Sequence, residues 1–180
     1  MSTLRKASAY SLKKVVPFTR VSKKKQKAYI KTVPPQKIVK FAMGNQQAFD
    51  AGKFKYHLTL TSEETIQIRH NALEACRQFL NKKLDQVLAG QYFFRVIPFP
   101  HHIQRENKML TGAGADRMQT GMQLSFGKTV GKAAILKKGA PIFFVAVGSP
   151  KAVQISRESF KQIKAKLPGR MKILYEEIKK

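Results

Sequence analysis

The chain has 180 residues, of which 43% are hydrophobic, and its 35 Lys and Arg against 10 Asp and Glu give a formal net charge of +25. This size and apolar content suit one hydrophobic core, and the charge indicates a polyanionic partner, most simply the phosphates of a nucleic acid. No apolar run approaches the roughly 20 residues that span a bilayer, and the cations are not gathered beside a lipidation signal, so we expect no membrane partner.

Residues 1–36 predict a basic arm rather than part of the core. No acidic residue precedes Asp50, and Val33-Pro34-Pro35 favours extended backbone because proline lacks an amide donor and restricts the residue before it. Tyr10, Phe18 and Tyr29 favour an arm that folds on its partner over a disordered solubilising tail, which remains the alternative. The candidate phosphate contacts in the arm are Arg5, Lys6, Lys13, Lys14, Arg20, Lys23, Lys24 and Lys25.

Residues 37–180 predict a single α+β domain, which begins with two strands and a helix. The strands cover Lys37–Met43 and Phe54–Leu60, and the second alternates apolar and polar side chains. Thr61-Ser62-Glu63-Glu64 has the pattern of a capping box, with acids where the helix end is positive. The helix that follows ends before Gly90, and its buried stripe is expected to hold Ile66, Leu73, Cys76, Leu80, Leu84 and Val87, with Arg69, Arg77, Lys82 and Lys83 on the solvated face.

The only cysteine, Cys76, is interpreted as a small core residue. One cysteine cannot form an intramolecular disulfide, and the N-terminus shows no apolar segment of secretory type. A reducing, cytoplasmic location is therefore expected.

The second half of the domain predicts more strands and one more helix. Tyr92–Ile97 is expected to be a central strand, and Met122–Phe126 a short one. Ala133–Lys137 and Ile142–Val147, joined by Lys138-Gly139-Ala140-Pro141, predict a hairpin.

Ser149-Pro150 predicts the start of the second helix, since serine caps helices and proline suits their first position. Pro168-Gly169 ends this helix, and Met171–Tyr175 is the final strand. We expect the helix to bury Val153, Phe160, Ile163 and Leu167. Strand pairs with two isolated helices indicate an α+β sandwich, a mostly antiparallel or mixed sheet with both helices on one side.

The region from Pro98 to Gly131 says most about function. Thr111-Gly112-Ala113-Gly114-Ala115 offers almost no side-chain surface to bury, and the cations nearby face only Glu106 and Asp116. A connection of this length without structure of its own is usually functional or disordered. We therefore expect a loop that protrudes at about residues 98–121 and becomes ordered against an external polyanion; a mobile loop without a partner is the alternative.

Catalytic chemistry finds little support in the sequence. The segment around Gly112 and Gly114 lacks the lysine and hydroxyl residue of a Walker phosphate-binding loop. His101 and His102 are neighbours, so on an extended chain their side chains point to opposite sides, which disfavours a metal site. Carboxylates are too sparse for an acid–base pair. We expect no catalytic residue, metal, cofactor or small-molecule substrate. Structured RNA fits the spread of cations better than duplex DNA, since no DNA-binding motif is present.

Four blocks of the sequence resemble the archaeal large-subunit ribosomal protein family L ten e, which includes bacterial L sixteen. They are Gln67–Ala75, Pro100-His101-His102 with Arg105–Met109, Gly112–Met122 and Phe126-Gly127-Lys128. The resemblance implies an α/β-hammerhead fold and a place in the large ribosomal subunit, among its other proteins. It also implies binding to large-subunit (23S-type) rRNA near the aminoacyl-tRNA site, and a role in positioning tRNA near the peptidyl transferase centre during translation.

The family's loop, carried onto this chain, runs from His101 to Gly121. The tRNA-facing candidates are His101, His102, Arg105, Asn107, Lys108, Gly112, Gly114, Arg117 and Gln119, and Lys128 and Lys132 join the arm as rRNA-binding candidates. The chain departs from the family pattern at Gln123, Thr129, Lys132 and Ile135, and in Ala9 and Ser11 around Tyr10. An RNA chaperone or architectural nucleic-acid-binding protein is the main alternative, and an RNA-modifying enzyme the second.

Overall fold

The structure, a computed structural model, describes residues 6–11, 32–106 and 127–178. The first half of the described chain holds β1 (Ala42–Gly44), α1 (Gln46–Asp50), β2 (Tyr56–Ser62), β3 (Ile66–Arg69) and α2 (His70–Leu88). The second half holds β4 (Tyr92–Val96), β5 (His102–Glu106), β6 (Lys128–Leu136), β7 (Pro141–Val147), α4 (Pro150–Lys164) and β8 (Met171–Glu177). The strand predicted at Met122–Phe126 lies outside the described residues.

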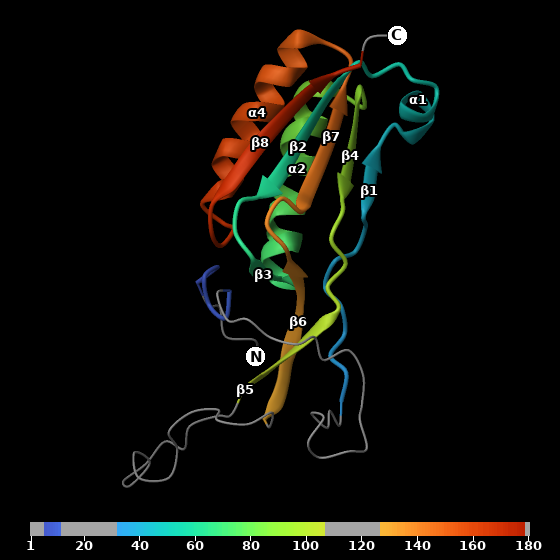
Figure 1. The fold of residues 1–180 in the computed structure, drawn as a ribbon. Coiled ribbons are helices and arrows are strands. Elements are labelled where there is room, and N and C mark those ends of the chain that lie inside the picture. The colour runs from blue at the N-terminus through green and yellow to red at the C-terminus, as the bar shows by residue number, and fades with distance from the viewer. Residues whose placement is uncertain (1–5, 12–31, 107–126, 179–180) are drawn as a thin grey trace, which may run out of the picture.

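The strands form two sheets that follow one another along the molecule. A five-stranded sheet has the order β1-β4-β7-β2-β8, and a three-stranded sheet the order β3-β6-β5. Figure 1 shows the smaller sheet below the larger one, so that the β5–β6 ribbon extends away from the helices. Every strand pairing in the described parts of the chain is antiparallel, which confirms the α+β class and the antiparallel character predicted from the sequence.

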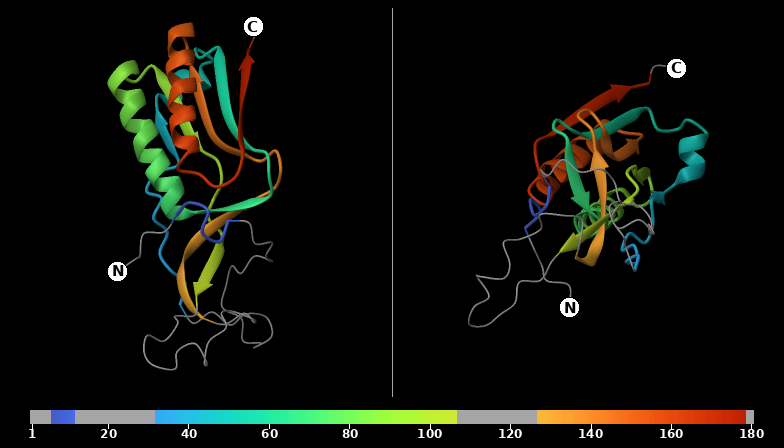
Figure 2. Two further views of the ribbon diagram at one scale, coloured as in Figure 1. Left: turned by 90° about the vertical axis from the view of Figure 1, so that its left-hand side faces the viewer. Right: turned by 60° about the horizontal axis from the view of Figure 1, so that its bottom comes forward.

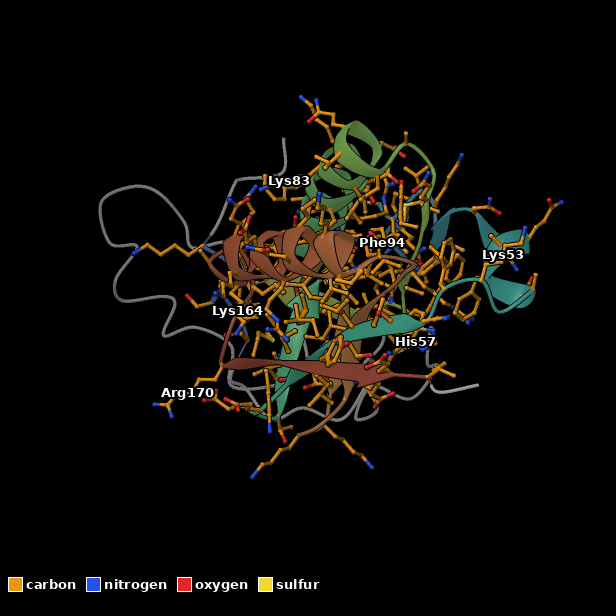
Figure 3. The ribbon with its side chains drawn as sticks, turned by 90° about the horizontal axis from the view of Figure 1, so that it is seen from above. Lys53, His57, Lys83, Phe94, Lys164 and Arg170 are labelled. Carbon is orange, nitrogen blue, oxygen red and sulfur yellow. The ribbon has the colours of Figure 1, made fainter. Side chains whose placement is uncertain are left out.

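Helices α2 and α4 lie side by side against one face of the larger sheet, as predicted (Figure 2). The core between helices and sheet is apolar and fully enclosed: Leu58, Leu80, Phe94, Phe143 and Phe160 have no exposed surface. Burial of this kind stabilises a fold by about 25 cal/mol per Å² of apolar surface removed from water. Figure 3 shows Lys83 and Lys164 at the helix layer, away from Lys53 and His57 beside α1.

Within the described ranges, no long helix covers the other face of the larger sheet (Figure 2). The short α1, which the sequence did not predict, covers one end through Phe49, whose ring stacks on Phe93 at 4.5 Å and meets Phe144 edge to face at 5.7 Å. Asn45 caps this helix, because its side-chain oxygen accepts a hydrogen bond from the Ala48 N–H. The strand predicted over residues 37–43 is shorter in the structure: β1 covers only Ala42–Gly44, because pairing with β4 begins at residue 42.

The predicted capping box at residues 61–64 is wrong. Thr61 and Ser62 end strand β2, and the Ser62 hydroxyl donates to the Glu64 carbonyl oxygen at 2.7 Å within a turn. The chain then forms β3, in which Ile66 pairs with Leu136 of β6. Strand pairing with a segment 70 residues away overrides the local capping pattern, and helix α2 begins only at residue 70.

The predicted hairpin of residues 133–137 and 142–147 is also wrong, because β6 and β7 belong to different sheets. The turn between them is real, with Gly139 at a φ of +82°, a conformation that favours glycine. Its backbone bonds go to the end of β2: the Gly139 N–H donates to the Ser62 carbonyl at 2.7 Å, and the Ser62 N–H donates to the Ala140 carbonyl at 3.0 Å. The chain therefore crosses from one sheet to the other here.

The second helix and the last strand are confirmed. The Ser149 side chain accepts a hydrogen bond from the Ala152 N–H, and Pro150 is the first helical residue. Phe160 and Ile163 are buried as expected. Along α2 the expectations for Val87 and Arg77 are wrong, since Val87 is 53% exposed and the Arg77 side chain is only 12% exposed, paired with Glu74.

Candidate nucleic-acid interface

The β5–β6 ribbon is the base of the segment that the sequence singled out. His102 pairs with Ala133 at the end nearer the domain, and Glu106 pairs with Lys128 at the far end. The chain leaves the described structure after residue 106 and returns at residue 127. The expectation of a loop starting at about residue 98 is therefore wrong in its first part, because His102 and Arg105 are held in a sheet by a partner strand that local sequence does not reveal.

A layer of buried polar side chains lies where the ribbon joins the domain, and we call it the polar layer. Gln104 of β5 and Gln67 of β3 are 5% and 4% exposed, and the Gln104 Nε2 donates to the Gln67 Oε1 at 3.1 Å. The further members of the layer are Arg69, His70 and His102. The Arg69 Nε, His70 Nδ1 and Gln104 Oε1 atoms are buried without a hydrogen-bond partner among the described residues, so the direction of the ribbon is set by the pairing of β6 with β3, which the Gln104–Gln67 bond supplements.

Both buried histidines of the polar layer are neutral at pH 7. Burial, followed by the nearby charges of Lys37, Arg69 and Lys132, lowers the pKa of His70 to about 4. Burial, His101 and Arg105 lower the pKa of His102 to about 4 in the same way. His102 is 4% exposed, so the role of tRNA-facing loop residue suggested for it is replaced by a role inside the protein.

The His70 ring packs directly against the backbone of β6. A Cβ atom built on Gly131 would lie 2.9 Å from the His70 Nε2, closer than real Cβ atoms approach. Glycine at position 131 thus lets the first residue of α2 sit against the ribbon. This contact joins the helix layer to the base of the ribbon.

Arg69 is a member of this site that sequence reasoning missed. We predicted it on the solvated face of a helix, but it is the last residue of β3 and only 7% exposed. Lys37 also acts on His70, from a segment far away in the sequence. The alternation of apolar and polar residues over Ile66–Arg69 indicates a strand, but all four residues are buried, so this pattern would not have placed Arg69 inside the protein.

Residues 6–11 of the arm lie against β3 in the structure. The Gln67 N–H donates to the Ser11 carbonyl at 2.9 Å, and Ser11 is 2% exposed. The Ser11 hydroxyl donates to the Ser8 carbonyl at 2.7 Å, which closes a turn. This part of the arm therefore packs beside the polar layer, and Lys6 is exposed there.

The structure brings together only some of the predicted site residues. Lys128 is exposed at the far end of the ribbon, and Lys132 is half-buried on the same strand. Arg105 is half-buried on β5, where burial lowers its pKa, and the His101 Nδ1 lies 3.1 Å from the Phe99 carbonyl oxygen. The others lie outside the described residues: Arg5, Lys13, Lys14, Arg20, Lys23, Lys24, Lys25, Asn107, Lys108, Gly112, Gly114, Arg117 and Gln119.

The structure bears directly on one further expectation. Cys76 is fully buried, as predicted, and burial raises the pKa of its thiol to about 12. Within residues 6–11, 32–106 and 127–178 there is no cluster of three or more metal-binding side chains. No helix in those ranges has both the length and the apolar character needed to cross a membrane.

Comparison with known proteins gives a consistent result. Residues 17–174 match the profile of the family described as ribosomal protein L16p/L10e. The chain is 40% identical over 177 residues to the large ribosomal subunit protein uL16 of Staphylothermus marinus, an alignment that covers 98% of this chain and 95% of the relative. It is similar to the proteins of the same name from Sulfolobus acidocaldarius, 44% identical over 82% of this chain and 83% of the relative, and Methanococcus maripaludis, 43% identical over 83% and 84%.

Proposed function

This chain belongs to the ribosomal protein L16p/L10e family, and we propose that it binds large-subunit rRNA near the aminoacyl-tRNA site and helps to position tRNA there. The family is one of structural ribosomal proteins and not of enzymes, so the chain is a component of the ribosome in the cytoplasm. Its partners are rRNA and other ribosomal proteins. The tRNA contact and the particular rRNA contacts form our proposal.

The observation that carries the proposal is the β5–β6 ribbon. It extends away from the helices (Figure 1), and the pairing of β6 with β3 sets its direction. The sequence between its two ends contributes Lys108 and Arg117 together with Gly112 and Gly114. Cations reach phosphates, and glycines permit close approach of a backbone to a ligand. A rigid base thus presents a basic, glycine-bearing segment to a partner outside the domain.

The arm supports the same orientation. Residues 6–11, the described part of the arm, pack on β3, the strand that pairs with the ribbon strand β6. Arm and ribbon are therefore proposed to bind rRNA on one side of the protein. Each neutralised phosphate contributes about −0.7 to −0.9 to the slope of log affinity against log salt.

The test separates rRNA binding from tRNA positioning. The double variant Lys108→Ala/Arg117→Ala should enter reconstituted large subunits normally but slow the accommodation of aminoacyl-tRNA. The matched control is Lys82→Ala/Lys161→Ala, which removes the same charge from exposed positions on α2 and α4. Equal accommodation by both variants in fully assembled subunits would contradict the tRNA role.

The two alternatives make different predictions. An RNA chaperone would leave large subunits during a high-salt wash, whereas a structural ribosomal protein sediments with them. An RNA-modifying enzyme would show turnover on rRNA as a purified chain. Membership in a ribosomal protein family favours stable sedimentation and no turnover.

A further inference from the structure

Phe99 is an exposed aromatic ring held in a fixed orientation. It is 57% exposed, and its ring stacks on Phe41, with ring centres 5.7 Å apart and planes inclined by 25°. Pro98 and Pro100, both buried, flank it in the sequence. Since proline fixes its own φ and restricts the preceding residue, the backbone that carries this ring has little freedom.

The ring lies at the junction of the two sheets, on the connection from β4 to β5. There the segment before β1 runs beside the end of β4, and the Val96 N–H donates to the Phe41 carbonyl at 2.7 Å (Figure 1). Val39 and Ile97, 74% and 41% exposed, belong to the same two segments. The fold therefore leaves an aromatic ring with apolar neighbours in water, although Phe41 already covers part of it.

The exposed charges of the two segments that form this patch are all positive, and the Glu74 carboxylate, which accepts a hydrogen bond from the Val39 N–H, is buried and paired with Arg77. The two segments, residues 37–41 and 95–101, contain Lys37, Lys40 and Arg95 and no carboxylate. All three cations are exposed. An aromatic ring among exposed cations is the combination that binds unpaired nucleotides, since a base stacks on the ring while the cations hold its phosphates.

A second exposed aromatic stack provides the contrast. Tyr175 of β8 is 42% exposed and stacks on Tyr56, with ring centres 6.3 Å apart. Here Glu176 and Glu177 follow in the sequence, and the Arg157 guanidinium already lies 5.8 Å from the centre of the Tyr175 ring. Exposure and stacking are thus shared, but the surroundings of Tyr175 repel phosphate and already supply a cation for the ring.

We propose that Phe99 is a stacking platform for an unpaired base of rRNA, with the exposed cations of residues 37–41 contacting the adjoining phosphates. The inference rests on the proposed binding to rRNA and adds to it a site on the domain itself, apart from the ribbon and the arm. Rigidity is what makes the site effective, because a ring fixed by two prolines and a stacked neighbour loses little freedom when a base binds.

The sequence offers a direct reporter for this stacking. The chain has no tryptophan, so Phe99→Trp introduces a single indole at the platform. Titration of the full-length variant with a short single-stranded oligoadenylate should quench its fluorescence. A duplex RNA of the same length should bind through charge without quenching. The matched control is Tyr175→Trp, which places the single indole on the acidic stack and should not be quenched by either RNA.

Affinity measurements complete the test. Anisotropy of labelled oligoadenylate should show affinity about 5- to 100-fold weaker for Phe99→Ala, the range expected for loss of one base–aromatic stack. Phe99→Leu should be similarly weakened, because leucine keeps the apolar surface but lacks the aromatic face. The slope of affinity against salt should not change in either variant.

The outcomes distinguish this site from the broader proposal. If Phe99→Trp binds oligoadenylate by anisotropy but is not quenched, or if Phe99→Leu binds as tightly as the natural chain, the stacking site is refuted while rRNA binding stands. The patch would then be better explained as a contact for another protein. Absence of any salt-dependent RNA binding by the natural chain would instead refute the rRNA binding on which this inference rests.

Discussion

Acid should destabilise this domain before its carboxylates titrate, because the polar layer buries two neutral histidines. His70 and His102 are 3% and 4% exposed, and the pKa of each is about 4, against 6.5 for an unfolded chain. A lowered folded-state pKa means that the unfolded chain binds protons first. Stability is therefore complete above about pH 6.5 and declines as the pH falls toward 4.

The magnitude follows from linkage. Between pH 7 and pH 5 each histidine costs about 2 kcal/mol of unfolding free energy, and the two together cost about 4 kcal/mol. His57, whose pKa burial also lowers, adds to the loss in the same direction. A total of this size is a large part of the 5–15 kcal/mol that typically separates folded from unfolded domains.

Urea unfolding of the full chain, measured at several pH values and high ionic strength, tests this reasoning. High salt screens the contributions of Lys37, Arg69 and Lys132 but leaves burial, the larger cause, in place. His70→Gln and His102→Gln should each flatten the dependence by up to one proton, about 1.4 kcal/mol per pH unit. If the double variant loses as much stability between pH 7 and pH 5 as the natural chain, the histidines are not the cause.

Three further substitutions test particular contacts by denaturant unfolding. Gly131→Ala should lower the free energy of unfolding by about 1–3 kcal/mol, because the new Cβ would lie 2.9 Å from the His70 Nε2. In a His70→Ala background the same substitution should cost much less, and additive effects of the two substitutions would contradict the contact. Ala89→Gly should stabilise by about 0.5–1 kcal/mol, since Ala89 ends α2 with a φ of +42°, and a loss would refute the strain there. Arg77→Met should lower the free energy of unfolding by about 3 kcal/mol, because it leaves the buried Glu74 carboxylate without the guanidinium that donates to it at 2.6 and 2.8 Å. A change below about 0.5 kcal/mol would show that water takes the place of the guanidinium.

Much of the fold was predictable wherever local signals and burial agree. The second helix carries its own cap in Ser149, a proline at its first position and an apolar stripe, and all three survive in the structure. Strand β4 is buried along most of its length, and a run of apolar residues in the sequence is enough to indicate that. The predicted type of element was wrong where long-range strand pairing determines it. Ile66 was expected in a helix because the preceding residues favour a helix start, but it lies in a strand and pairs with Leu136.

The candidate site divides in the same way. Its charge and its glycines are properties of composition, so the sequence alone indicated a nucleic-acid partner and, through the four resembling blocks, the ribosomal family. The polar layer was not predictable, because Gln67, His70 and Gln104 come from three elements and each resembles an ordinary surface residue when taken singly.

The sequence by itself determined the chemical class of this protein: its cations, its glycine-bearing segment and its family likeness are present whatever the fold. Only the tertiary structure decided which of those residues face outward. Strands β3 and β5 both pair with β6, and in this sheet Arg69 and His102 are buried. Phe99, which lies between two prolines and stacks on Phe41, is instead exposed to water. The physical reason is that burial depends on long-range contacts, whereas charge does not.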